Sequence, residues 1–312
     1  MMKIAGVREV SVRAPGKVNL QLTVGEPDER GMHPLATVFQ AVSVYEEVTA
    51  HLTTSGSGIT ISVSGRDAER VPTDATNIAH QAVLQIARAT GVVNRDGEPD
   101  IHLHIEKEVP VGGGMAGGSA DAAATLVACN ELWRTHLSQT KLDEIGAELG
   151  ADVTFCMHGG MAVGTGYGER LAPVLSAGEY FWLFVLDSEP ISTGAAYREL
   201  DERERQIPDP LVVRSELMAA LRSGDPAAVG AELRNDFQEL ALEARPELRK
   251  IFEFAEENLA AGAVVSGSGP TVAILAPSLW YQRELKAAFS DAGVGGELVT
   301  AHGPVHGARV VC

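Results

Sequence analysis

Positive charge is scarce in this sequence of 312 residues, and so are long apolar runs. There are 25 Lys and Arg residues against 42 Asp and Glu residues, which gives a formal net charge of −17. An acidic chain repels polyphosphate backbones and anionic lipid surfaces. Nucleic acid and anionic membranes are therefore excluded as main partners. No apolar run is long enough to span a bilayer.

Cysteine is also rare, with only Cys129, Cys156 and Cys312 in the chain. No two of them have the spacing of a metal site, and three thiols cannot all pair within one chain. The first eight residues lack the apolar segment of a secretory signal peptide. These absences predict a protein of the reducing cytoplasm.

The remaining composition is that of a globular protein. Hydrophobic residues make up 45% of the chain and charged residues 21%, which is enough apolar material for a sizeable core. A chain of 312 residues makes one large domain or two of ordinary size. We find no internal repeat.

The most informative stretch runs from Pro110 to Ala124, in which five glycines fall within seven positions. The segment 101–109 before it is predicted to be a strand, and the alanine-rich segment to about Trp133 a helix. Glycines that lead into a helix N-terminus expose backbone N–H groups and the positive end of the helix dipole, so the stretch predicts an anion site. A flexible linker would lack these apolar flanks. No Gly-Lys-Ser/Thr closes the loop, which excludes a Walker A motif, and its match to the dinucleotide fingerprint is weak.

Hydrophobic periodicity predicts the other elements. We expect strands at 10–24 (interrupted at Pro15-Gly16), 38–50, 59–63, 162–167, 181–186, 263–265, 272–275 and 297–301. We expect helices at 78–91, 141–149 and 278–291, with mostly helical structure over 195–259. Strand–helix–strand arcs after residue 165 suggest a split β-α-β second domain. The predicted domains are 1–165 and 166–312.

Four features are candidates for chemistry, and each also has a purely structural interpretation. Lys17 is one of six lysines and is suited to meet a phosphoryl group, or it is a solvated strand residue. Asp152 is a candidate general base, or an N-cap for a turn that starts at Val153. Ser119 is a phosphate or metal contact, or the N-cap of its helix. The glycine turn 266–271 is a second phosphate contact, or only a hairpin turn.

Together, three motifs resemble those of the GHMP small-molecule kinases. They are Val12–Leu20 around Lys17, the glycine-rich Pro110–Ala124, and Ser266–Thr271. The resemblance implies an α+β fold of two domains. It implies a ribosomal protein S5 domain 2-like N-terminal domain that binds ATP, and a ferredoxin-like C-terminal domain on the substrate side.

Further residues are similar to those of the family members that phosphorylate the 2-hydroxyl of cytidine diphosphate methylerythritol in non-mevalonate isoprenoid precursor biosynthesis. The similarity rests on four groups of residues: Lys17 with Asn19, Gly31-x-His33 followed by Thr37-Val38-Phe39, Gly150–Val153, and Asn235–Phe237. Met32 departs from the pattern, because an aromatic residue often precedes the histidine.

The resemblance implies a role for each matching residue. Asp152 corresponds to the catalytic base and Lys17 to its partner, and Ser119 is the expected Mg²⁺ contact. The expected ATP contacts are Asn77, Pro110, Gly112, Gly113, Gly114, Met115, Ala116, Gly117, Gly118 and Ser119. The expected substrate contacts are Asn19, His33, Asp152, Tyr197 and Thr271.

The predicted activity is phosphoryl transfer from ATP to a small-molecule alcohol, by a monomer or weak homodimer. Alternatives remain open at this point. A homoserine- or mevalonate-type kinase or the diphosphomevalonate decarboxylase would share the three motifs. A non-catalytic nucleotide-binding homologue would be expected to lack Lys17 or Asp152. A nicotinamide-dependent dehydrogenase is disfavoured, because an alanine-rich helix occupies the place where it needs a second strand with an acidic residue.

Overall fold

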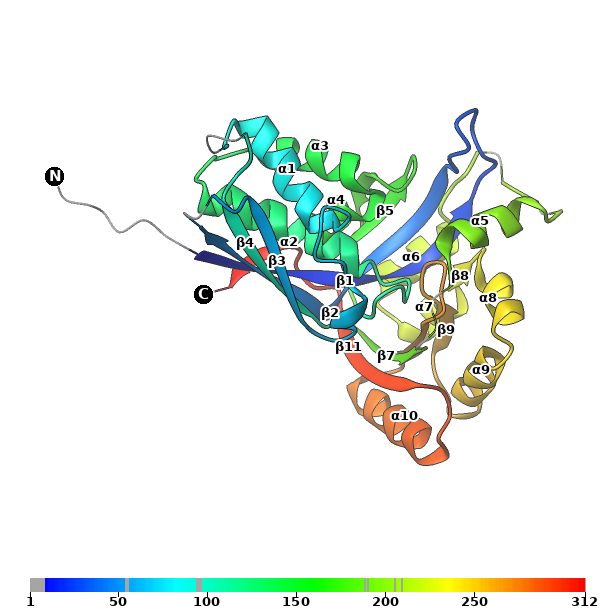
Figure 1. Cartoon of the computed structure of the whole chain (residues 1–312). Helices are drawn as coiled ribbons and strands as arrows, with labels where there is room; N and C mark the ends of the chain where they lie inside the picture. The colour runs from blue at the N-terminus through cyan, green and yellow to red at the C-terminus, as the bar shows by residue number, and fades with distance from the viewer. Residues whose placement is uncertain are drawn as a thin grey trace.

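In the computed structural model, residues 9–53, 56–93, 97–187, 189, 191–204, 206–208 and 210–311 are described. The first eight residues, on which the absence of a signal peptide was judged, and Cys312 lie outside these ranges. Runs of strands and runs of helices follow one another along the chain and form two sheets with helices packed on them (Figure 1). No helix within the described ranges has the length and apolar character needed to cross a bilayer.

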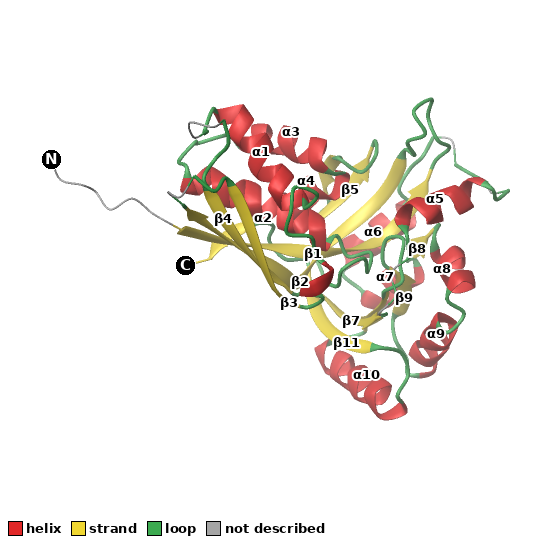
Figure 2. Ribbon diagram, in the orientation of Figure 1, coloured by secondary structure: helices red, strands yellow, loops and turns green. Residues whose placement is uncertain are grey.

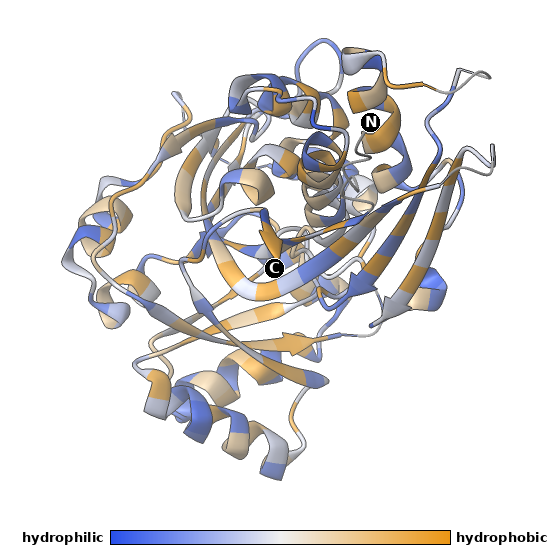
Figure 3. Cartoon of the chain, turned by 90° about the vertical axis from the view of Figure 1, so that its left-hand side faces the viewer, coloured by the Kyte–Doolittle hydropathy of each residue, from blue (hydrophilic) through white to orange (hydrophobic). Residues whose placement is uncertain are grey.

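The larger sheet is built on two long antiparallel strands, β1 (Glu9–Val24) and β2 (Leu35–Leu52). Within the described residues it has eight strands, in the order β12-β1-β2-β4-β3, with β5 and β6 beside β2 and β8 beside β1. Along the second half of β2, buried and half-buried residues alternate, and Figure 3 shows alternating hydropathy along the strands. The remaining strands of this sheet are β3 (Ile59–Gly65), β4 (Ile101–Lys107), β5 (Met161–Thr165), β6 (Arg170–Pro173), β8 (Arg234–Asn235) and β12 (Arg309–Val311).

The predicted break at Pro15-Gly16 is wrong. Strand β1 continues through these residues, and its register against β2 shifts between Pro15 and Gly16. At this irregularity the amide of Lys17 donates to the carbonyl of Met115 at 3.0 Å. A Cβ at Gly16 would lie 3.2 Å from that carbonyl oxygen, so a side chain there would crowd the contact. The bulge thus brings β1 against the glycine loop.

Helices cover one face of the larger sheet, as Figure 2 shows. They are α1 (Ile78–Thr90), α2 (Gly117–Leu132), α3 (Gln139–Leu149) and α4 (Ala151–His158), with the short 3₁₀ turn η1 (Ala68–Arg70) after β3. Helix α1 starts and ends as predicted, with Asn77 as N-cap and Gly91 in a left-handed conformation after its last residue.

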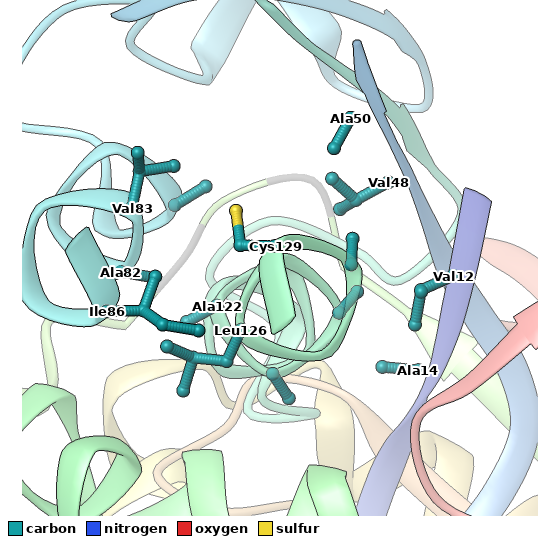
Figure 4. Close-up of a cluster of buried hydrophobic side chains, with 14 of the residues drawn as sticks. Val12, Ala14, Val48, Ala50, Ala82, Val83, Ile86, Ala122, Leu126 and Cys129 are labelled. Atoms are coloured by element: carbon teal, nitrogen blue, oxygen red, sulfur yellow. The ribbon is translucent and has the colours of Figure 1, made fainter. Parts of the chain in front are cut away.

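Helix α2 lies at the centre of this layer and is surrounded by apolar side chains (Figure 4). Its alanines allow close approach of α1 on one side and of the sheet on the other. The labelled residues of this core are Val12 and Ala14 of β1, Val48 and Ala50 of β2, Ala82, Val83 and Ile86 of α1, and Ala122, Leu126 and Cys129 of α2. The core therefore fixes α2, and with it the end of the glycine loop.

The second sheet has four antiparallel strands in the order β11-β7-β10-β9. In chain order they follow the pattern β-α-β-β-α-β, which confirms the predicted split β-α-β, ferredoxin-like arrangement. The strands are β7 (Tyr180–Leu186), β9 (Gly262–Val265), β10 (Val272–Ala276) and β11 (Glu297–Gly303). The helices of this half are α5 (Thr193–Asp201), α6 (Ser215–Ser223), α7 (Pro226–Ala231), α8 (Gln238–Ala244), α9 (Leu248–Glu257) and α10 (Leu279–Ala292).

The two sheets share a buried core. Trp182 and Phe184 of β7 pack in one cluster with Val18 and Leu20 of β1, and the indole Nε1 of Trp182 donates to Gln40 Oε1 at 2.6 Å. The last strand, β12, returns to pair with β1. Because strands on both sides of residue 165 pair in the larger sheet, a domain boundary at that residue stays a prediction.

Candidate active site

A cavity of about 380 Å³ lies where the glycine loop, β1 and the second half of the chain meet. Its walls bring together residues of all three sequence motifs. Of the predicted site residues, the cavity is lined by Lys17, Asn19, Pro110, Gly112, Gly113, Gly114, Ala116, Gly117, Gly118, Ser119, Asp152 and Tyr197. The cavity is also lined by residues from the other matched groups, namely Phe39, Phe237, Gly267 and Ser268. The sequence analysis did not single out the remaining lining residues, which are Leu22, Leu35, Ile78 and Thr193.

The glycine loop ends in the helix N-terminus that an anion site requires. Ala116 has a left-handed conformation (φ 63°) as N-cap, and α2 begins at Gly117. The expectation that Ser119 starts or caps this helix is therefore wrong, because Ser119 is its third residue. The first amides of α2 have no partner within the helix and are available to an anion in the cavity.

The third motif packs directly on the glycine loop. Gly114 has φ +79°, and a Cβ on it would lie 1.9 Å from the carbonyl oxygen of Ser266. The hydroxyl of Ser266 donates to the carbonyl of Gly114 at 3.1 Å. Glycine is thus required at position 114 by both the backbone conformation and the close approach.

Asn235 holds the third motif in place. Its amide nitrogen donates to the carbonyl oxygens of Val265 and Gly267, at 2.7 and 2.6 Å. Its side-chain oxygen accepts from the amide of Phe237 at 2.9 Å. Asn235 is buried, so loss of this side chain would leave two carbonyls unsatisfied. The Asn235–Phe237 pattern thus has a structural role that the sequence did not reveal.

Thr271 and Met115 are placed behind the loop and do not line the cavity. Thr271 is fully buried, and its hydroxyl lies 2.8 Å from where a Cβ on Gly113 would be. Met115 is buried under the loop, and its carbonyl accepts from the amide of Lys17. Their predicted ligand contacts stay predictions.

Lys17, Asn19 and Asp152 meet beside the glycine loop. The Lys17 ammonium donates to Asn19 Oδ1 at 2.7 Å and lies 3.7 Å from Asp152 Oδ2. The Asn19 amide donates in turn to Thr37 Oγ1 at 2.8 Å. The side chain of Lys17 is 6% exposed and that of Asp152 is 28% exposed. The Asp152 carboxylate is therefore accessible from the cavity, whereas the Lys17 ammonium is largely buried beside Asn19.

The interpretation of Asp152 as an N-cap is wrong. Gly150 occupies that position, and Asp152 is the second residue of α4. A carboxylate in the first turn of a helix is stabilised by the helix dipole, which favours its ionised form. The carboxylate of Asp152 thus lies both in the first turn of α4 and 3.7 Å from the Lys17 ammonium.

The other end of the cavity is aromatic. The ring of His33 stacks on that of Tyr197 with centroids 4.7 Å apart, and Tyr197 meets Phe237 edge-on at 4.9 Å. The His33 ring nitrogens lie 3.1 Å from the carbonyl of Gly25 and 3.5 Å from Asp201. Burial, with a contribution from Asp152, raises the pKa of Tyr197 to about 12, so its hydroxyl stays protonated. Tyr197 lines the cavity, whereas His33 lies behind it.

The side chain of Asn77 is engaged in hydrogen bonds at the start of α1. Its Oδ1 accepts from the amide of Ala79 at 2.8 Å, and its Nδ2 donates to the carbonyl of Pro72 at 2.6 Å. The next residue, Ile78, lines the cavity instead. The adenine contact that the resemblance implies for Asn77 stays a prediction.

Comparison with known proteins gives matches over nearly the whole chain. The models for the GHMP kinases N terminal domain and the GHMP kinases C terminal match residues 77–160 and 217–296. A 4-diphosphocytidyl-2-C-methyl-D-erythritol kinase of Clavibacter michiganensis is 46% identical, over 97% of this chain and 96% of the relative. A protein of the same name from Thermobifida fusca is also 46% identical, over 97% and 98%.

The chain belongs to the GHMP kinase family. It is accordingly an ATP-dependent small-molecule kinase with the two-domain α+β fold of GHMP kinases, as predicted.

Solved GHMP kinase structures have the same fold. The crystal structure of a 4-(cytidine 5'-diphospho)-2C-methyl-D-erythritol kinase matches with a TM-score of 0.71 and 26% identity, over 94% of this chain and 99% of that one. A homoserine kinase from Cytophaga hutchinsonii matches with a TM-score of 0.76 at 20% identity, over the full length of both. The second likeness shows the fold alone. The choice among family members therefore rests on sequence identity and on the site.

Proposed function

We propose that this GHMP kinase transfers the γ-phosphoryl group of ATP to the 2-hydroxyl of 4-diphosphocytidyl-2-C-methyl-D-erythritol, a step of non-mevalonate isoprenoid precursor biosynthesis. The observation that carries the proposal is the 46% identity, over nearly the full chain, to relatives with that kinase name. The cavity supports it, because it is lined by an anion-binding loop, a lysine–aspartate pair and aromatic residues.

In this proposal, each region of the cavity binds a different part of the two substrates. The amides of Gly112–Ser119 receive the triphosphate. Asp152 and Lys17 stand at its γ-phosphate end, 3.7 Å apart. Tyr197, with His33 stacked behind it at 4.7 Å, offers a flat surface for the cytosine ring, and Met32 adds no second aromatic face.

The chemical step follows from these positions. The substrate hydroxyl attacks the γ-phosphorus, the bond to the bridging oxygen breaks, and ADP leaves. Asp152 accepts the hydroxyl proton, and the Lys17 ammonium offsets the negative charge that spreads over the transferring group. Asn19 holds the ammonium at 2.7 Å, which orients it toward the cavity. Catalysis of this kind rests mainly on positioning and electrostatics.

Mg²⁺ fits this site only as a phosphate-bound ion. Within the part of the chain that the structure describes, no three His, Cys, Asp or Glu side chains gather to hold a metal on their own. Mg²⁺ commonly keeps several waters and binds phosphate oxygens with few protein ligands. Ser119, in the first turn of α2 and on the cavity wall, is the proposed protein contact. When bound, the ion would neutralise phosphate charge.

The test is ADP release by the purified chain with ATP and each of three acceptors: the cytidylylated methylerythritol, homoserine and mevalonate. We expect turnover on the first alone. Lys17→Ala and Asp152→Ala should each lower it at least about a hundredfold. Lys141→Ala and Asp143→Ala, of the same residue types on α3 and away from the cavity, are the controls. Turnover on homoserine or mevalonate but not on the first acceptor would overturn the proposal.

A further inference from the structure

A chain of three buried hydrogen bonds leads from the Lys17 ammonium into the larger sheet. Lys17 Nζ donates to Asn19 Oδ1 at 2.7 Å, and Asn19 Nδ2 donates to Thr37 Oγ1 at 2.8 Å. The Thr37 hydroxyl donates in turn to the carbonyl oxygen of Gln21 at 2.6 Å. Thr37, on β2, is fully buried and does not line the cavity. Any effect of Thr37 on the reaction is therefore exerted through other residues.

An irregularity of the sheet places the Gln21 carbonyl where Thr37 can reach it. The register of β1 against β2 shifts between Asn19 and Gln21, so β1 has one residue more than β2 at this point. An extra residue of this kind disrupts the regular ladder and turns the strand locally. Beside it, the Thr37 hydroxyl bonds to the backbone of one residue of β1 and to the side chain of another.

Packing fixes the direction of the Thr37 hydroxyl. Thr37 is paired with Gly164 of β5, and a Cβ on Gly164 would lie 2.9 Å from Thr37 Cγ2. The methyl group of Thr37 thus occupies the space that the absent side chain of Gly164 leaves. Because a β-branched side chain has few allowed rotamers, a methyl group held on the β5 side keeps the hydroxyl on the β1 side.

The donors and acceptors along the chain set the orientation of the Asn19 amide. A lysine ammonium has donors only, and an asparagine amide has a donor end and an acceptor end. The hydroxyl proton of Thr37 is used on the Gln21 carbonyl, so its oxygen can only accept from Asn19. The amide nitrogen of Asn19 must therefore face Thr37, and its oxygen must face Lys17. The reverse orientation would place the amide nitrogen against the ammonium and leave two buried donors unsatisfied.

We propose that Thr37 is a positioning residue for the phosphoryl transfer: it orients the Asn19 amide, and through that amide it holds the Lys17 ammonium beside Asp152. The proposal rests on the proposed function for the part that Lys17 plays in the transfer. The orientation of Asn19 by Thr37 does not depend on which acceptor is phosphorylated.

The first test compares kcat in variants of Thr37, with the acceptor that the chain turns over. Thr37→Val keeps the branched shape and removes the hydroxyl, so the Asn19 amide is free to turn and the ammonium to shift. We expect kcat to fall roughly tenfold to a hundredfold, the range for a catalytic group displaced by about 1 Å. Thr37→Ser restores the hydroxyl and should keep kcat within about threefold of wild type.

Thr49→Val is the matched control. Thr49 also lies on β2, is half-buried, and has a hydroxyl that bonds to β1, 2.7 Å from Ser11 Oγ. It does not line the cavity. This variant removes an equivalent bond between the same two strands and should keep kcat within about twofold of wild type.

A double-mutant cycle separates action through Asn19 from a general effect on the sheet. Asn19→Ala removes the amide that Thr37 orients and should itself lower kcat. If Thr37 acts through this amide, Thr37→Val should change kcat by no more than about twofold in the Asn19→Ala background.

The second test observes the Lys17 ammonium directly by NMR of the chain labelled with ¹⁵N in its lysine side chains, without substrates. The Lys17 signal is the one that Lys17→Met removes. In Thr37→Val the exchange of the ammonium protons with water should speed up at least about tenfold, because the bond to Asn19 is lost. Thr37→Ser and Thr49→Val should keep the wild-type rate. If Thr37→Val does not fold, as judged by circular dichroism, Thr37→Ala takes its place, since it places no methyl group against the Gln21 carbonyl.

Four results would overturn the proposal. They are wild-type kcat in the folded hydroxyl-free variant, an equally low kcat in Thr37→Ser, a further large loss from Thr37→Val in the Asn19→Ala background, and unchanged exchange of the Lys17 ammonium. The NMR measurement needs neither ATP nor an acceptor. A chain whose Lys17 signal responds as expected but which does not phosphorylate the cytidylylated acceptor refutes only the proposed function.

Discussion

Substitution of Gly114 by alanine should damage the phosphate-binding loop far more than substitution of a glycine four residues later. Gly114 has φ +79°, and its new Cβ would lie 1.9 Å from the carbonyl oxygen of Ser266, 2.9 Å from the carbonyl carbon of Ser266 and 3.2 Å from the amide nitrogen of Gly269. All three are backbone atoms, so no flexible side chain can yield. The third motif would have to move away from the glycine loop.

The size of the effect follows from two contributions. A left-handed conformation is unfavourable for alanine by about 1–2 kcal/mol. Displacement of the third motif also breaks the hydrogen bond from the Ser266 hydroxyl to the Gly114 carbonyl, now 3.1 Å long, which contributes about 0.5–1.5 kcal/mol. Together they give a loss of roughly 1.5–3.5 kcal/mol. For a chain of this size the apparent unfolding temperature should fall by roughly 2–5 °C.

Gly118→Ala is the matched control for stability. Gly118 is the second residue of α2, and its new Cβ would meet only Ile78 Cγ2, at 3.7 Å. Alanine favours the helix over glycine by up to about 1 kcal/mol, so this variant should be as stable as wild type or slightly more stable. Thermal unfolding followed by circular dichroism measures both variants. Equal unfolding temperatures for the two variants would refute the account of how the second and third motifs meet.

Three further predictions concern the site and its support. Lys17→Met and Asp152→Asn should each lower kcat by about 10²–10⁴, and a flat pH–rate profile with near-normal turnover in Asp152→Asn would remove the base role. Glu46→Gln should gain stability relative to wild type as pH rises from 5 to 8, by about 1 kcal/mol per pH unit, and the gain should level off above pH 8. The sign follows because folding raises the pKa of Glu46 from 4.5 to about 8, so the folded chain keeps a proton that the unfolded chain releases. Urea unfolding measures this prediction, and a stability advantage of Glu46→Gln over wild type that shrinks as pH rises would contradict it. Asn235→Ala should destabilise the chain by roughly 2–4 kcal/mol, since two carbonyls lose their donor. The control Asn258→Ala, which loses one side-chain hydrogen bond to a carbonyl, should be destabilised by about 1 kcal/mol or less. Equal losses of stability in the two variants would show that Asn235 does not hold the third motif.

Much of the fold could be predicted from local pattern, because periodicity reports which face of an element is buried. Alternation predicted β1, and the capping signals at Asn77 and Gly91 gave both ends of α1. The three residues of β12 and the two of β8 were missed. Each is a strand only because it pairs with β1, from a distant part of the sequence.

The residues that line the site could largely be predicted from the sequence, but the residues that hold them in place could not. The glycine loop, Lys17 and Asp152 carry short motifs, and the structure brings them to one cavity. The start of α2 was misplaced by two residues, because glycines within a loop and glycines at the head of a helix look alike in sequence. The buried ion pairs of Lys107 with Glu46 and Asp121 join β4, β2 and α2, and only the position of Lys107 directly before the glycine loop offered a signal in the sequence.

The measurement that tests the central claim most directly is phosphorus NMR of the products formed by the purified chain from ATP and 4-diphosphocytidyl-2-C-methyl-D-erythritol. The account predicts one new phosphomonoester signal, in equal amount to the ADP released, on the 2-hydroxyl of the acceptor, and none with Asp152→Ala. ADP release without a phosphorylated acceptor, or a phosphorylated product only from homoserine or mevalonate, would contradict it.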